Sequence, residues 1–450
     1  MKINLYEIKH LFISKKNIDD NFIFDSEDIF IDSRIITKNK IFIALKGKNF
    51  NANSFIPEVM KQNPKMVVTD NNDLNEGPFL NVECTNKFFM ELASFILNKL
   101  KAKKIGITGS NGKTTTKELI TFFLKNKFPN KVLSTIGNFN NDIGLPLTIM
   151  SAKGNEEFVV LEMGTNHPGE IEILADVVKP NISIITNIGD AHIGNYKNQR
   201  AIAQEKKNIF KFLKADDFKI IDGKNKFLSE LNDSPGKLFL TSEEKSGNEV
   251  LNYQNSHGRE VNLNYHTESV IIECPIDGEH NKQNLILACA AIIKLGFSLS
   301  SLKDGWLNFT SIDGRFKKTI LNSGAELIDD SYNSNPESMK SAIDYLSKIN
   351  NKKKILILGD MGELGENSGH YHEKIVSKIN NSNLDIVYGM GLEIEKAFKK
   401  NKGKNLYIFH DKSELIKIIQ PLLSMNVIIL IKASRFMNFD TIVRDIKELK

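Results

Sequence analysis

Short apolar runs alternate with polar turns and amphipathic stretches along most of the chain. In the first hundred residues, apolar runs at 41–45 and 66–68 precede a stretch with helical periodicity at 88–100. After a basic, solvated segment at 99–104, the order strand, turn, helix repeats. The apolar runs that mark its strands lie at 104–108, 158–161 and 182–186. Such runs, ending in glycine, asparagine or a charged residue, are typical of buried parallel strands whose carboxyl ends carry the functional loops.

The last third of the chain repeats this alternation. Its apolar runs lie at 326–328, 354–358, 385–388, 406–409 and 427–431. Enough residues separate each pair for a crossover helix, so a second doubly wound sheet is expected. Residues 220–270 are more polar and less periodic, and they predict a variable antiparallel part of the central region.

Composition and charge exclude several classes of protein. Hydrophobic residues make up 41% of the chain and charged residues 26%, the balance of a globular protein rather than of a collagen, a coiled coil or a disordered chain. The net charge of +5 is small for 450 residues, so no nucleic-acid partner is expected. The longest apolar run, 285–293, is about half as long as a membrane span requires.

The chain termini and the cysteines predict a cellular location. The N-terminal sequence MKINLYEIKHLF is too mixed to contain the apolar core of a secretory signal. The three cysteines, Cys84, Cys274 and Cys289, have no CxxC spacing and no even count, so neither a disulfide framework nor a thiolate zinc site is implied. We therefore expect a cytoplasmic protein without a membrane span.

The sharpest motif is KKIGITGSNGKTTTKELI, in which a strand runs into a glycine-rich turn and then into a helix. Gly109 and Gly112 let backbone amides approach phosphate oxygens, and the helix N-terminus adds a positive dipole. Lys113 then supplies a charge to the β- and γ-phosphates, and Thr114 supplies a hydroxyl to Mg²⁺. The usual GxxxxGK[ST] string is shifted, because its first glycine stands one place early, at Gly106. A chance GKT in a turn is the alternative, and the strand and helix around it favour nucleoside triphosphate binding.

Two further strand ends offer metal ligands. Glu162 follows the apolar run of FVVLEMG, where P-loop enzymes hold a metal-binding acid. The next strand, in SIITNIGDAHIG, delivers Asn187 and then His192. His192 is either an ordinary loop histidine or the ligand of a second metal near Glu162.

One lysine stands on an apolar helix face. In AIAQEKKNIFKFL, Ile202, Ile209, Phe210 and Leu213 lie within one arc at about 100° per residue, and Lys206 falls inside that arc. A buried lysine cation is costly unless it snorkels, pairs or changes chemically. Periodicity alone favours snorkelling to solvent, and the alternative is a modified lysine or one close to a metal.

An ordered series of strings along nearly the whole chain resembles the Mur ligase family, the ATP-dependent amide-forming enzymes of peptidoglycan synthesis. The strings are DSR at 32–34, IFIALKG at 41–47, GITGSNGKT at 106–114, GNFNNDIGLPLT at 137–148, LEMGTNHPGEI at 161–171, GEHNKQNLILACAA at 278–291, DGR at 313–315, DDSYNSNPESM at 329–339, LGDMGELGE at 358–366 and IKASR at 431–435. The family's GxxGxxGKT loop accounts for the early glycine. A P-loop binding module without activity would not predict this series.

The resemblance implies an α/β fold of three domains. These are a small α/β domain at 1–101 that binds a uridine nucleotide, a central P-loop NTPase-like domain with a mostly parallel sheet at 102–314, and a Rossmann-like domain at 315–450 that binds the incoming amine. The strings imply ligation of D-Ala-D-Ala to UDP-MurNAc-tripeptide with ATP, two Mg²⁺ ions and an acyl-phosphate intermediate, by a monomer. The alternatives are another ligase of the family or a relative of folylpolyglutamate synthase.

The resemblance also implies residue roles. Carbamylation of Lys206 would turn it into a carboxylate-like ligand that holds the second Mg²⁺ with Glu162 and His192. The residues implied at ATP are Gly109, Ser110, Asn111, Gly112, Lys113, Thr114, Thr115, Asn281, Asn284, Arg315 and Asp330. Those implied at the nucleotide-sugar peptide and the dipeptide are Ser33, Arg34, Lys46, Asn140, Asn141, Asn166, His167, Lys432, Ser434 and Arg435.

The chain departs from the family's pattern at three places. The first-domain loop reads GKNFNANSF, where relatives more often carry an Asp-Gly-His step. Asn195 and Tyr196 follow AHIG in place of a glutamate-containing continuation. KASR replaces KGSR, with Ala433 in place of glycine.

Overall fold

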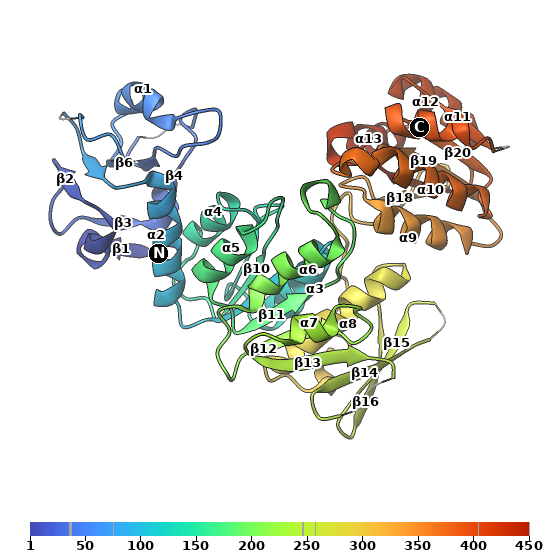
Figure 1. Ribbon diagram of the computed structural model, residues 1–450, viewed down its shortest axis with the longest axis horizontal. Helices are drawn as coiled ribbons and strands as arrows, with labels where there is room; N and C mark the ends of the chain where they lie inside the picture. Colours follow the sequence, from blue (N-terminus) through green and yellow to red (C-terminus); the bar gives the residue numbers. More distant parts are fainter. Residues whose placement is uncertain (36–37, 75, 245–246, 257, 404, 450) are drawn as a thin grey trace.

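The computed structural model describes residues 1–35, 38–74, 76–244, 247–256, 258–403 and 405–449. The described chain forms three lobes, with the N-terminal and C-terminal lobes on either side of the central one (Figure 1). Each lobe has its own sheet with helices packed against it, and most neighbouring strands within the three larger sheets run parallel. The predicted α/β class is therefore confirmed.

The N-terminal lobe is built on a small sheet. Its elements are β1 (Lys2–Asn4), β2 (Ser14–Lys16), β3 (Ile23–Asp25), β4 (Ile29–Phe30), β5 (Ile41–Ile43), α1 (Ile56–Met60), β6 (Met66–Thr69), β7 (Phe79–Asn81) and α2 (Thr85–Lys99). The sheet order is β2-β7-β6-β5-β4, and β1 pairs separately with β3. Strands β5 and β6 are fully buried, as their continuous apolar runs predict.

The central lobe holds the largest sheet. Its strands are β8 (Lys103–Thr108), β9 (Val132–Ser134), β10 (Phe158–Glu162), β11 (Ile182–Ile185), β12 (Phe218–Asp222), β13 (Lys237–Ser242), β14 (Val250–Asn255), β15 (Glu260–Tyr265) and β16 (Glu268–Glu273). Its helices are α3 (Lys113–Lys127), α4 (Gly144–Met150), α5 (Glu170–Val178), α6 (Gln199–Lys207), α7 (Leu228–Asn232) and α8 (Glu279–Lys294). The strand order is β16-β15-β14-β13-β12-β11-β8-β10-β9, so the strand before the P-loop lies inside the sheet.

The prediction of an antiparallel region at 220–270 is partly wrong. Strands β12, β13 and β14 continue the parallel sheet from β11, and antiparallel pairing begins only between β14 and β15. Consecutive apolar residues do mark β12 and β13, at 220–221 and 238–240, but these runs are shorter than those of the predicted strands and stand among polar connections.

The longest apolar run lies in α8, which is buried on nearly every side. This helix packs on α3 and on β12 and β13, so its all-round hydrophobicity belongs to a protein core. Among the described residues, no helix combines the length and the hydropathy that crossing a bilayer requires.

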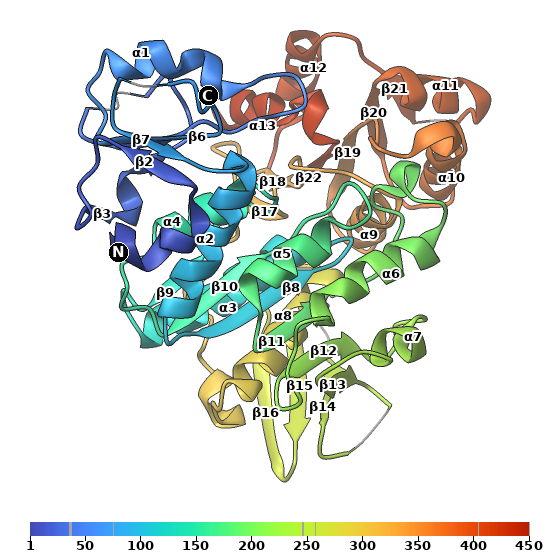
Figure 2. The ribbon, with the colours of Figure 1, turned by 60° about the vertical axis from the view of Figure 1, so that its left-hand side comes forward.

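Helix α2 joins the first two lobes. It packs on α4 and α5 of the central lobe (Figure 2), and its buried face, including Phe88, Leu92 and Ile96, belongs to one continuous apolar cluster with central residues such as Ile149 and Leu174. The N-terminal lobe is therefore fixed to the central lobe by a shared core.

The C-terminal lobe is a second doubly wound sheet, as predicted. Its elements are β17 (Lys317–Ile320), β18 (Glu326–Asp329), α9 (Pro336–Ser347), β19 (Lys353–Gly359), α10 (Ser368–Asn380), β20 (Ile386–Met390), α11 (Leu392–Lys400), β21 (Leu406–Ile408), α12 (Lys412–Ile419), β22 (Val427–Lys432) and α13 (Asp440–Lys447). The order is β17-β18-β22-β19-β20-β21, with β17 antiparallel and the others parallel. Two apolar clusters cover its faces, and one of them extends into the central lobe, where Ile276 belongs to it and Ile193 and Phe309 pack against it.

Candidate functional site

The glycine-rich turn between β8 and α3 has the backbone of a phosphate loop. Gly109 has φ 154° and Gly112 has φ 79°, conformations that side chains disfavour. A Cβ at Gly112 would lie 2.1 Å from Oδ1 of Asn284, so packing as well as dihedral angle requires glycine. Gly106, by contrast, lies within β8 and outside the turn.

The loop is held from the end of β11. Asn187 accepts a hydrogen bond from the amide of Asn111 at 2.9 Å through Oδ1, and its carbonyl accepts from the amide of Ser110 at 3.0 Å. Lys113, the first residue of α3, donates to the carbonyl of Gly109 at 2.8 Å. Burial lowers the pKa of Lys113, Glu162 opposes this shift and Arg315 adds to it. Sequence reasoning placed Asn187 at a strand end but gave it no role in holding the loop.

Glu162 ends β10 beside this loop and is buried. The hydroxyl of Thr114 donates to its Oε2 at 2.8 Å, and Nδ2 of Asn140 donates to its Oε1 at 2.7 Å. Asn140 therefore contacts the acid directly, whereas the resemblance implied a contact with the substrate peptide. The backbone of Glu162 donates to Oγ1 of Thr135 at 2.8 Å.

His192 lies after β11 and meets the C-terminal lobe. Its Nδ1 is 2.6 Å from Oε2 of Glu363, and this contact lowers the pKa of the Glu363 carboxyl. Glu363 belongs to the string LGDMGELGE, but it was not among the predicted site residues.

Lys206 is buried, so the prediction that it snorkels to solvent is wrong. Its exposed fraction is 2%, and burial, with Lys113 adding to it, lowers its pKa well below the usual range. Among the residues that the structure describes, none accepts a hydrogen bond from its amine. The neighbouring carboxylate of Glu205 instead accepts from the amides of Gly169 and Ile171 at 2.7 and 2.8 Å.

A cavity of about 520 Å³ lies where the central and C-terminal lobes meet. The predicted residues that line it are Ser110, Asn111, Gly112, Lys113, Thr114, Thr115, Asn140, Asn141, Glu162, Asn166, His192, Asn281, Asn284, Arg315, Asp330 and Lys432. The structure thus gathers most of the predicted ATP and metal residues around one space. The predicted residues outside its lining are Gly109, Lys206, His167, Ser434, Arg435, Ser33, Arg34 and Lys46.

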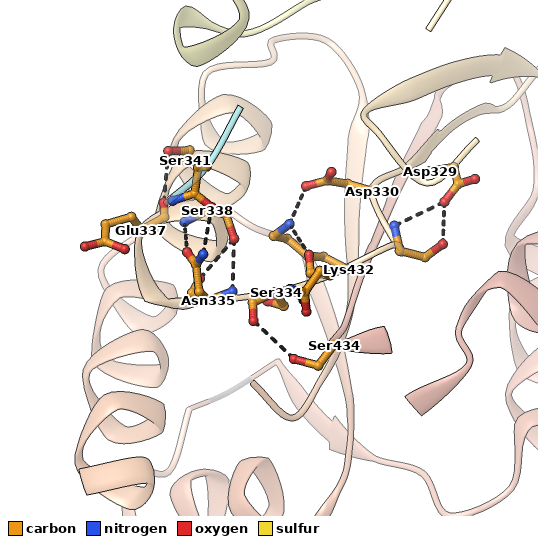
Figure 3. A network of polar contacts seen from close by, with 12 residues as sticks. Asp329, Asp330, Ser334, Asn335, Glu337, Ser338, Ser341, Lys432 and Ser434 are labelled. Atoms are coloured by element: carbon orange, nitrogen blue, oxygen red, sulfur yellow. Dashed lines mark hydrogen bonds and ion pairs between the residues drawn. The ribbon is translucent and has the colours of Figure 1, made fainter. Parts of the chain in front are cut away.

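Figure 3 shows the C-terminal wall of the cavity, where β18 leads into α9. Lys432 at the end of β22 is buried, and its amine pairs with Oδ2 of Asp330 at 2.6 Å. Ser434 donates to the carbonyl of Ser334 at 3.1 Å, and it accepts from the amide of Gly362 at 2.7 Å. Lys432 and Ser434 therefore fix the loops of this wall to one another.

Two contacts join this wall to the central lobe. Nδ2 of Asn335 donates to Oδ1 of Asn111 in the phosphate loop at 2.7 Å. Oε1 of Glu337, at the start of α9, accepts from the amide of Asp190 at 2.8 Å. Neither residue was predicted, although both lie in the string DDSYNSNPESM, because contacts between lobes leave no periodic signal in sequence.

Arg315 lines this space and carries an unsatisfied donor. Its guanidinium stacks on Tyr332 at 3.9 Å and reaches Oγ1 of Thr114 at 3.4 Å, while its buried Nε has no hydrogen-bond partner among the described residues. A buried guanidinium nitrogen without an acceptor fits an anionic ligand.

The residues predicted at the uridine nucleotide lie in the N-terminal lobe. Nζ of Lys46 pairs with Oδ2 of Asp70 at 2.7 Å, and Asn53, within the unusual loop string, donates to Oδ1 of the same carboxylate at 2.7 Å. Arg34 is exposed and pairs with Asp32 at 2.7 Å. The structure does not bring these residues to the cavity.

These features define a P-loop enzyme that uses a nucleoside triphosphate: the phosphate loop, the carboxylate of Glu162 beside it, and Arg315 with its unpaired donor. Residues 107–292 match the protein family described as "Mur ligase middle domain", and residues 314–435 match the family described as "Mur ligase, glutamate ligase domain". The chain belongs to the Mur ligase family.

Full-length relatives carry one particular name. A UDP-N-acetylmuramoyl-tripeptide–D-alanyl-D-alanine ligase from Haemophilus influenzae is 31% identical, with 100% of this chain and 99% of that protein covered. The crystal structure of MurF from Acinetobacter baumannii is similar with a TM-score of 0.85 and 29% identity over 93% of both chains. MurF from Thermotoga maritima in complex with ADP gives a TM-score of 0.83 and 25% identity over 94% of this chain and 98% of that one.

Proposed function

We propose that this chain joins D-alanyl-D-alanine to UDP-MurNAc-tripeptide at the expense of ATP, giving UDP-MurNAc-pentapeptide, ADP and phosphate in peptidoglycan synthesis. The observation that carries the proposal is the single cavity that the phosphate loop, Glu162 and the C-terminal wall share. Relatives of the same length that bear this ligase's name support it.

The charges in the cavity suit formation of an acyl phosphate. A carboxylate has no leaving group, so it must first attack the γ-phosphorus of ATP, which releases ADP. Lys113, the loop amides and the guanidinium of Arg315 neutralise the charge that gathers on the transferring group. The amine of the dipeptide then attacks the acyl carbon, and the tetrahedral intermediate expels phosphate. No protein nucleophile is required.

The residues around Glu162 fit Mg²⁺. A buried carboxylate that bonds the hydroxyl of Thr114 at 2.8 Å offers oxygen donors, which this ion prefers. We propose Thr114 and Glu162 as ligands of one ion, and Glu162, His192 and a carbamylated Lys206 for a second. When bound, Mg²⁺ withdraws charge from phosphate oxygens. Among the described residues, no cluster of three His, Cys, Asp or Glu side chains forms a metal site, and Mg²⁺ is commonly held by one or two carboxylates together with water and substrate phosphates.

The state of Lys206 supports carbamylation. Its lowered pKa favours the neutral amine, and a neutral amine is the form that attacks CO₂. A new N–C bond forms between Nζ and the carbon of CO₂ and a proton leaves to solvent, so the neutral amine becomes an anionic carbamate that can bind metal. Lys206 does not line the cavity, but Lys113, which does, influences its pKa.

We assign the three lobes to the three substrates, in the order uridine nucleotide, ATP and dipeptide, with the boundaries 1–101, 102–314 and 315–450. The chain is proposed to act as a monomer in the cytoplasm, where its free cysteines Cys84, Cys274 and Cys289 suit a reducing environment. The C-terminal lobe reaches the phosphate loop, and its contact would exclude water that otherwise hydrolyses the acyl phosphate.

Phosphate release by the purified chain tests the proposal. ATP, D-Ala-D-Ala and UDP-MurNAc-tripeptides containing either diaminopimelate or lysine are supplied together and with each component left out. We expect release only when all three substrates are present, and loss of it in Lys113→Ala but not in Lys125→Ala, an exposed position of the same helix. Release driven by a single amino acid in place of the dipeptide would instead indicate another ligase of the family.

A further inference from the structure

Two loops from different lobes meet beside the cavity. Residues 190–195 follow β11 in the central lobe, and residues 360–366 follow β19 in the C-terminal lobe. The amide of Gly194 donates to the carbonyl of Glu363 at 2.9 Å. A Cβ at Gly194 would lie 2.6 Å from the backbone nitrogen of Gly365, so any side chain there would push the loops apart.

The same loops bring His192 to Glu363. Nδ1 of His192 lies 2.6 Å from Oε2 of Glu363, and this buried nitrogen has no hydrogen bond of ordinary geometry among the described residues. No protein group in the described chain bonds Nε2 of His192, whose side chain lines the cavity. An imidazole with its proton on Nδ1 presents a lone pair at Nε2, the form that binds a divalent cation.

Both residues have a backbone that L-amino acids disfavour. His192 has φ 61° and Glu363 has φ 62°. Such conformations persist where their surroundings determine them, and they gather at functional sites. The Glu363 side chain is 48% exposed, and ion pairs with such exposure add little stability. Stability of the fold therefore does not account for the contact, whereas orientation of the imidazole does.

We propose that Glu363 is a positioning residue that orients His192 when the C-terminal lobe closes on the central lobe. The inference rests on the proposed function and adds a property to it. The cation site beside Glu162 is complete only while the two loops touch, because the carboxylate that orients its histidine comes from the other lobe. Carboxylate partners of this kind change metal affinity by about 10–100-fold. Closure and metal retention are thereby coupled.

The test measures metal binding without turnover. The full chain, saturated with ADP, is titrated with Mn²⁺, and the free ion is followed by electron paramagnetic resonance. We expect Glu363→Ala to weaken Mn²⁺ binding by about 10-fold or more, and Glu363→Gln to weaken it less. Gly194→Ala keeps both side chains but separates the loops, so it should weaken binding similarly. Glu366→Gln, an exposed change in the same loop, is the matched control and should bind as the unmodified chain does.

A kinetic measurement separates orientation from damage to the fold. In Glu363→Ala, product formation should return toward the unmodified rate at high Mg²⁺, with the Mg²⁺ requirement raised and the KM for the dipeptide unchanged. Equal Mn²⁺ affinity in the unmodified chain and both Glu363 variants would overturn the inference, while product formation would still support the proposed function. Absence of nucleotide-dependent metal binding in the unmodified chain would overturn both. If Gly194→Ala does not fold, the Mn²⁺ affinities of the two variants at the half-exposed Glu363 decide the question alone.

Discussion

Lys206 is the residue for which sequence and structure together make the most specific chemical prediction. It follows Glu205 on α6 in a buried position where a cation is costly, and its amine has no acceptor among the described residues. A carbamate would supply the negative charge that the proposed metal site uses.

A small anion should partly replace the carbamate charge in a variant that lacks Lys206. We expect Lys206→Ala to lose most product formation, and short carboxylates such as acetate or formate to restore part of it by occupying the vacated volume. Phosphate release with and without added carboxylate measures this. Full activity of Lys206→Ala at limiting bicarbonate would contradict the carbamate role.

The buried lysine should also lower the stability of the unmodified fold. Its pKa is depressed in the folded state, so below the unfolded lysine pKa the unfolded chain binds this proton more tightly than the folded chain does, which favours unfolding. Lys206→Met removes this cost, and we expect its free energy of unfolding to rise by roughly 0.5–2 kcal/mol in CO₂-free buffer while activity is lost. The gain should shrink as the pH rises toward the unfolded lysine pKa of about 10.4.

Thermal unfolding across pH measures this effect. Lys207→Met is the control, because Lys207 lies at the flank of the same helix face, is partly exposed and pairs with Asp233 at 3.7 Å. An equal rise in the free energy of unfolding of both variants would show that the added hydrophobicity of methionine, and not removal of a buried amine, causes the effect.

At the scale of elements, the turn between β8 and α3 shows why two glycines of one motif differ. Gly112 has a positive φ, and a Cβ there would meet Asn284, whereas a Cβ at Gly106 would meet flexible side-chain ends, the nearest being Cε of Met163 at 3.1 Å. We expect Gly112→Ala to abolish measurable ATP binding and Gly106→Ala to retain it with a small loss of stability. Binding of a fluorescent ATP analogue, with unfolding measured in parallel, checks both. Unchanged ATP binding in Gly112→Ala would show that the turn does not bind the phosphates.

The strands around this turn illustrate what sequence could predict. Continuous apolar runs gave β10, β11, β19 and β22 to within two residues, because a strand buried on both faces needs an apolar residue at every position. The parallel pairing of β12 to β14 escaped prediction, because the apolar runs of β12 and β13 span only two or three residues within a polar region.

Some residues of the candidate site could likewise be predicted from sequence and others could not. Residues at strand ends and in the phosphate loop could be predicted, because topology alone gathers them. Asn187, Glu337 and Glu363 could not, because their roles depend on the angle at which loops or lobes meet. Asn140 lines the cavity and donates to Glu162, a contact that the sequence did not reveal, and its predicted contact with the substrate peptide stays a prediction.

At the scale of the molecule, the first two lobes share a large apolar core. The third joins the central lobe through polar contacts and a smaller apolar contact, in which Ile276 packs into the C-terminal cluster. Polar contacts between lobes separate more readily than a shared apolar core, because water replaces them at little cost. The C-terminal lobe is therefore the part expected to move during turnover. The contacts that reach the phosphate loop are those expected to hold this lobe in its closed position.

Asn335 allows that contact to be removed without damage to the helix that carries it. Its Oδ1 caps α9 by accepting from the amide of Ser338 at 3.0 Å, while its Nδ2 donates to Asn111 at 2.7 Å. Asn335→Asp keeps the cap, since aspartate is an equally good N-cap, but it has no donor for Asn111 and places a negative charge near the phosphates. We expect an unchanged or slightly higher melting temperature together with a raised KM for ATP.

Asn335→Ala separates the two roles of this side chain. It loses both bonds, so the helix should lose about 1 kcal/mol while the KM for ATP also rises. Melting temperatures and steady-state kinetics of the two variants, measured side by side, decide between a closing contact and a simple cap. If the aspartate variant kept the unmodified KM, the contact with Asn111 would have no part in nucleotide binding, and the coupling of closure to ATP would have to come from Glu337 and Arg315.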